Sequence, residues 1–209
     1  MKLVDALRTP SYRRSVLIRR CLSLLFVGTA AVSVVSSRAA EPLVVSFARD
    51  VSAGSVVGAA DLELRRVPAS SVPDNAVTAV EGANGKVLAA AASAGEILTT
   101  TRLVGAELAD DLTQGETSGE PFTMVPVALA EPDIIPMLYH GATVSVITAT
   151  GDAARPSTIA TGGRVVLAGG AEKKNDATVL LLLRESQAAA VAAASLTSPL
   201  TVVLGRPGV

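Results

Sequence analysis

The alternation of apolar and polar positions predicts β structure over most of the chain. Residues 43–48 form a short β-branched segment, residues 61–67 alternate polar and apolar as in a half-buried strand, and residues 87–91 are expected to form a return strand. Later segments predicted as strands from their apolar and β-branched residues are 122–129, 141–148, 163–168, 178–183 and 200–204. One soluble α-helix is predicted over 186–194, because alanine has the highest helix propensity, with Ser186 as its N-cap. The fold class is therefore mainly β with one soluble helix.

A repeated phrase organises the first β-rich segment. A Ser-Ala-Gly sequence, two apolar residues and a leucine eight positions after the glycine occur at 52–62 and again at 93–103. Two copies are too few for a solenoid but suit a small β unit with two related halves. Glycine enters left-handed turns without a Cβ penalty, so chain reversals are expected at the glycines. The predicted structural turns are Gly54, Gly85, Gly95 and Pro73.

The first forty residues have the pattern of a membrane or export segment. A basic lead, 1–20, precedes an apolar run that extends over 21–37, just long enough for a transmembrane helix. We expect an uncleaved anchor with its N-terminus in the cytoplasm and the later domains outside. A signal peptide cleaved after Ala39 is the alternative, and a buried helix of a soluble domain is a third. Cys21, the single cysteine, lies at the start of the run and lacks a lipoprotein context.

Charge changes sign along the chain. Residues 1–40 contain seven basic residues and one acidic residue, whereas the rest contains 11 basic and 18 acidic residues. An acidic outer part with few aromatic residues argues against nucleic-acid binding. Residues 105–121 are acidic, contain Gly and Ser, and are predicted to be a solvated linker between two domains.

The sequence shows no recognisable arrangement of catalytic or metal-binding residues, and the adjacent Asp110-Asp111 are interpreted as part of a solvated linker rather than as catalytic carboxylates or a metal site. His140, the single histidine, has no exported cysteine to activate, and no Cys or His cluster accompanies it. Gly85-Lys86 lacks the other residues of a phosphate-binding loop. We predict no catalytic, cofactor-binding or metal-ligating residues, and therefore no enzyme activity. The partner-binding surface cannot be assigned from sequence.

Residues 43–104 resemble a SAF domain, the antifreeze-like β-clip module. The resemblance lies in the order and spacing of an opening strand and of Arg49-Asp50-Val51, Gly54, Asp61-Leu62, Pro73, Gly85, Gly95-Glu96 and Leu103. It implies a long hairpin folded back on itself, with the two glycine turns in related places.

The second half, 122–206, is similar to Flp-pilus assembly proteins of the CpaB/RcpC type. The similarity lies in the strand from Gly141 to Ile147, in strand 178–183 running into a Gln187-Ala188 helix, and in the terminal strand 200–204. Glu185-Ser186 stands where the family often has Pro-Glu. The order of anchor, SAF module and β-rich (α+β) domain is the stronger part of this resemblance.

The expected function is that of a membrane-anchored, non-enzymatic assembly or scaffolding factor. By resemblance it would act on a Flp-type pilus at the extracytoplasmic side, bound to the membrane through residues 21–37 and to protein partners of pilus or envelope assembly. A module that binds cell-wall glycan is the first alternative. An exported chaperone resembling flagellar ring assembly proteins, and an accessory domain of a sugar-acid enzyme, are further alternatives.

Overall fold

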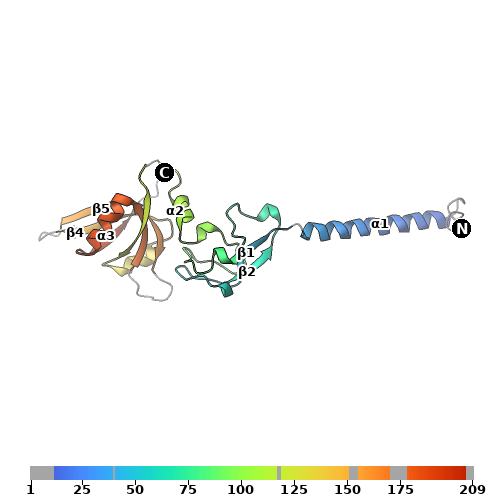
Figure 1. Cartoon of the computed structure of the whole chain (residues 1–209), viewed down its shortest axis with the longest axis horizontal. Coiled ribbons are helices and arrows are strands. Elements are labelled where there is room, and N and C mark those ends of the chain that lie inside the picture. Colours follow the sequence, from blue (N-terminus) through green and yellow to red (C-terminus); the bar gives the residue numbers. More distant parts are fainter. Residues whose placement is uncertain (1–11, 40, 117–118, 151–154, 170–177, 206–209) are drawn as a thin grey trace. The chain divides into compact units, whose positions relative to one another are not determined.

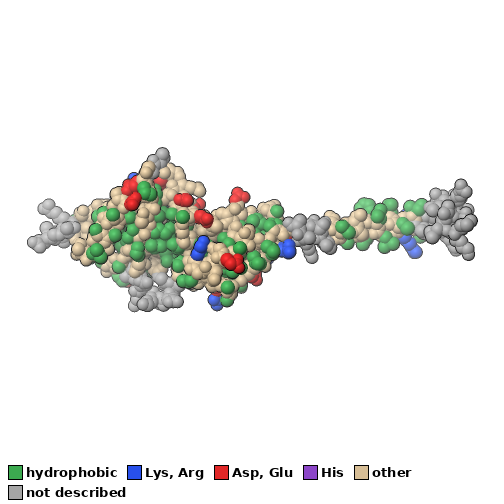
Figure 2. All heavy atoms as spheres, in the orientation of Figure 1, with side chains coloured by type: hydrophobic (Ala, Val, Ile, Leu, Met, Phe, Trp, Pro, Cys, Tyr) green, Lys and Arg blue, Asp and Glu red, His purple; other side chains and the backbone are tan. Residues whose placement is uncertain are grey.

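The computed structural model describes residues 12–39, 41–116, 119–150, 155–169 and 178–205. The chain divides into two compact units, Met1–Pro42 with Arg66–Ser71, and Leu43–Arg65 with Val72–Val209. In the first unit, α1 spans Tyr12–Ala39. Hydrophobic side chains lie along the described part of α1 (Figure 2), and those of Leu22, Leu24, Leu25 and Phe26 are all more than half exposed. Within the described residues, no helix meets the combined length and hydropathy needed to cross a bilayer.

Residues 43–104, which belong to the second unit apart from 66–71, form a β-rich body, the β-clip body. Its strands β1 (Leu43–Phe47) and β2 (Leu62–Arg66) form a two-stranded sheet (Figure 1), so both predicted strands are present. Most of the remaining ladder consists of single bridges, such as Val51 with Ala92 and Val56 with Val87. The predicted return strand over 87–91 is therefore not a continuous strand. Short 3-10 turns connect the segments: η2 (Ala59–Asp61), η3 (Ala69–Ser71), η4 (Val80–Gly82) and η5 (Thr100–Arg102).

The C-terminal body is a five-stranded antiparallel sheet in the order β3-β6-β5-β4-β7. The strands are β3 (Phe122–Ala128), β4 (Thr143–Thr150), β5 (Arg155–Ala168), β6 (Thr178–Arg184) and β7 (Leu200–Leu204). The 3-10 helix η6 (Pro132–Met137) precedes β4, and α3 (Glu185–Ser195) connects β6 to β7. The strands and the helix predicted in this half are confirmed, although β5 is longer than expected.

Both faces of the sheet are covered, so its interior strand β6 has apolar residues on either side. Leu181 and Leu183 pack in one core with Ala188 and Val191 of α3. Leu182 packs in a second core with Leu108, which belongs to α2 (Ala106–Leu112). A strand buried on both faces explains the nearly continuous apolar sequence of 178–183.

Two expectations differ from the structure. Residues 105–121, predicted to be a solvated linker, include α2, whose Leu108 is buried because the sheet offers it an apolar face. Ser186 is not the N-cap of α3: that position is Arg184, and the Ser186 N–H donates to Glu120 Oε1 at 2.6 Å. A carboxylate from before β3 thus satisfies a backbone donor in the first turn of α3.

Candidate binding surfaces

The predicted turns lie at the corners of the β-clip body. Gly54, Gly85 and Gly95 have φ angles of 79°, 82° and 81°, which favour glycine. The Gly54 N–H donates to Leu88 O at 2.7 Å, and the Gly95 N–H donates to Phe47 O at 2.7 Å. The carbonyl of Pro73 accepts from Ala76 N at 3.0 Å. These residues shape the body and do not converge on one site.

A buried carboxylate fastens the segment between β1 and β2 of the β-clip body. Asp61 Oδ2 accepts from the Gly58 N–H at 2.8 Å, and its Oδ1 pairs with the Arg49 guanidinium. The Gly58 N–H, assisted by Arg49, lowers the pKa of the Asp61 carboxyl, although burial opposes this shift. The group is satisfied within the domain, so it has a structural role.

His140 is held by the backbone. His140 lies in the loop before β4, and its Nδ1 is 2.8 Å from Val166 O of β5. Among the described residues, no cluster of three or more His, Cys, Asp or Glu side chains could hold a metal ion.

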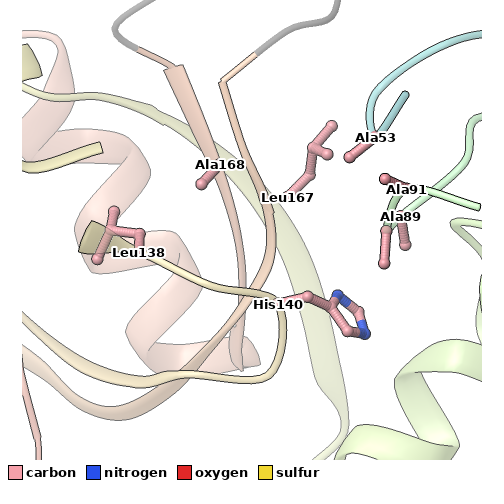
Figure 3. A pocket seen from close by; sticks show the side chains of 8 residues that line it. Ala53, Ala89, Ala91, Leu138, His140, Leu167 and Ala168 are labelled. Carbon is pink, nitrogen blue, oxygen red and sulfur yellow. The ribbon is translucent and has the colours of Figure 1, made fainter. Parts of the chain in front are cut away.

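His140 also lines a hollow of about 220 Å³ in the second unit. Figure 3 shows Leu138, Leu167 and Ala168 around it, opposite alanines of the β-clip body. Cofactor and drug-sized ligand sites usually have volumes of about 300–1,000 Å³. The hollow is smaller and mostly apolar, so it suits one or two protein side chains better than a cofactor.

A charged cluster that the sequence did not reveal lies beside α2. Glu116 is 3.8 Å from Arg164 and 3.5 Å from Arg184. All three side chains are partly exposed, so this pairing contributes little to stability. No local signal could have found it, because Glu116 and Arg184 are 68 residues apart.

The two edges of the five-stranded sheet differ. At the start of β3, the Glu185 N–H donates to Pro121 O. Because hydrogen-bonded positions alternate along an antiparallel pair, the backbone groups of every second residue of β3 face β6 and those of the residues between face outward. Pro126 occupies one outward position, where it has no N–H to offer a further strand. The opposite edge, β7, contains neither proline nor a charged residue.

Comparison with known proteins supports the assignment of the β-clip body. Residues 44–104 match the SAF domain family model, which confirms the SAF prediction for that segment. No curated protein and no solved structure matches the chain.

Proposed function

We propose that this chain is a membrane-anchored, non-enzymatic assembly or scaffolding factor that acts on a Flp-type pilus at the extracytoplasmic side. The observation behind it is the SAF match at 44–104, which lies in the sequence between a helix with exposed apolar side chains and a second β-rich body. The similarity of 122–206 to CpaB/RcpC-type proteins, with strand β6 running into α3, supports the pilus assignment.

The side chains of α1 support attachment to a lipid phase through residues 21–37. Leu24, Phe26 and Val32 are 72%, 73% and 69% exposed. Removing one such side chain from water is worth about 1.5–3 kcal/mol, so a helix with several of them has a strong tendency to be covered. The arginines that precede the run favour a cytoplasmic N-terminus.

Tethering and recognition together give the physical mechanism. A membrane tether raises the effective concentration of the two β bodies for any partner in the same membrane. Recognition uses surfaces suited to protein partners: an apolar hollow that fits a side chain, and a sheet edge that fits an added strand.

The experiment has two parts. Membrane fractionation of the intact chain, with N-terminal sequencing, tests the anchor. We expect full-length chain in the membrane fraction, and a soluble species beginning near Glu41 would refute the tether. Deletion of the coding sequence should abolish surface pili seen by electron microscopy, and expression of the whole chain should restore them.

A matched variant and a binding assay separate the alternatives. A chain exported through a cleavable signal in place of residues 1–40 should restore fewer pili than the whole chain. Unchanged piliation in the deletion strain would refute the pilus role. Retention of this exported form by purified cell wall would then favour the glycan-binding alternative.

A further inference from the structure

Strand β7 has an open backbone edge whose geometry can be derived from its pairing. In the register of β4 with β7, Thr143 is opposite Gly205, and the Gly205 N–H donates to Thr143 O at 2.8 Å. Antiparallel pairs alternate between hydrogen-bonded and non-hydrogen-bonded, so the backbone groups of Thr201 and Val203 also face β4. Those of Leu200, Val202 and Leu204 face away from β4.

One of these outward positions is occupied, and two are open. Leu200 O accepts from the Ala130 N–H at 2.8 Å. Within the described part of the chain, the outward N–H and C=O of Val202 and Leu204 have no hydrogen-bond partner. The side chains of Val203 and Leu204 are 48% and 40% exposed. Uncharged, proline-free edges of this kind are templates for strand pairing.

We propose that β7 pairs with β7 of a second copy of this chain, antiparallel about a twofold axis at Val203. In this register Val202 lies opposite Leu204 of the other copy, and the four outward groups of each copy pair with those of the other copy in four hydrogen bonds. The two Val203 side chains meet as a non-hydrogen-bonded pair on the axis.

The open groups favour this register over the one centred on Val202. Moving the axis to Val202 places Leu204 opposite Leu200, whose carbonyl already accepts from Ala130. The register centred on Val203 satisfies the open groups of both copies using only Val202 and Leu204. A second copy of β7 therefore supplies a donor or acceptor for each open group of the first. Neither edge has a charged side chain that would oppose the contact.

The contact between the two β7 strands is small, so the strength of dimerisation depends on the local concentration of the chain. Only residues 201–205 of each copy pair, whereas stable interfaces use roughly 20–30 residues a side. Dimerisation is therefore weak in dilute solution and stronger where two copies share a membrane. The pairing itself does not depend on the pilus assignment, since it follows from β7 alone.

Cysteine cross-linking tests the axis. In a Cys21→Ser background, Val203→Cys places one cysteine of each copy on the axis, with the two Cβ atoms about 4.5–5.5 Å apart. Thr201→Cys is the matched control. In the proposed dimer Thr201 lies opposite Gly205 of the second copy, so the two Thr201 residues are about 13 Å apart along the strand. Mild oxidation of membranes holding the full chain should give at least about tenfold more disulfide-linked dimer for V203C than for T201C. Equal yields, or no dimer from V203C, would overturn the proposal.

A second measurement does not depend on thiol chemistry. Two differently tagged full-length copies should co-purify, and Val203→Lys should reduce this by roughly fivefold or more, because like charges would meet on the axis. Val56→Lys, at a valine that is 62% exposed in the β-clip body, should leave co-purification unchanged. An equal response of both variants would also overturn the proposal.

Discussion

Gly54 and Gly95 occupy equivalent turns of the β-clip body. Their φ angles are 79° and 81°, and each N–H donates to a carbonyl across the body at 2.7 Å. The leucines eight positions later, Leu62 and Leu103, are both buried. The repeated sequence phrase therefore corresponds to a repeated structure, two corners that enclose one apolar core.

Alanine at either corner should destabilise the protein. A Cβ in the left-handed region costs about 1–2 kcal/mol, so Gly54→Ala and Gly95→Ala should each lower the free energy of unfolding by about 1 kcal/mol. Gly105→Ala is the matched control, since its backbone is extended and nothing lies within 4 Å of an added Cβ. Urea denaturation would measure all three. Equal effects at Gly105 and at the corners would show that the corners do not need glycine.

Asp61 should make part of the stability depend on acid. Because folding lowers the pKa of this carboxyl, its contribution is present above the unfolded pKa and is lost as the pH falls through the folded pKa. Asp61→Asn should therefore cost about 1–3 kcal/mol near neutral pH and much less at acid pH. Unfolding curves over that range would check this, with the exposed Asp133→Asn as control. A constant difference between wild type and Asp61→Asn at every pH would contradict the role given to the charge.

Glu120 should support α3 through its first turn. Hydrogen bonds from Ser186 lower the pKa of the Glu120 carboxyl, so its contribution is present above the unfolded pKa and disappears in acid. Glu120→Gln should lower the melting temperature by a small amount at neutral pH and by less in acid. Glu107→Gln, at an exposed position in α2, provides the comparison by circular dichroism. A larger effect at Glu107 would argue against a stabilising role for the hydrogen bond between Glu120 and the Ser186 N–H.

Local patterns were sufficient for some strands but not for others. Residues 200–204 are mostly apolar and form β7 with the predicted bounds. Residues 87–91 have a similar apolar character, yet Val87 and Leu88 bridge to separate partners, Val56 and Leu103, so no continuous ladder develops. That outcome depends on tertiary pairing, which alternation along one segment does not encode.

The helix α2 and the open edge illustrate the same limit. Composition alone suggested solvation for the acidic segment, but Leu108 is buried against Leu182, which is distant in sequence. Likewise, the sequence of β7 does not say that it is an edge strand. Only the order β3-β6-β5-β4-β7 places Pro126 on one edge and leaves Val202 open on the other.

Gly163 is the position in the sheet where close packing should be most sensitive to one added carbon. A Cβ there would lie 2.5 Å from Leu183 Cδ2, and Leu183 is 1% exposed, so it has little room to move. Gly163→Ala should therefore cost about 1–3 kcal/mol by overpacking. Leu183→Ala alone should cost about 2–5 kcal/mol through the cavity that it leaves. In the double variant the new methyl group enters that cavity, so the two costs should sum to more than the measured loss. Chemical denaturation of all four proteins gives this coupling energy, and strict additivity would show that the two side chains do not compete for the same space.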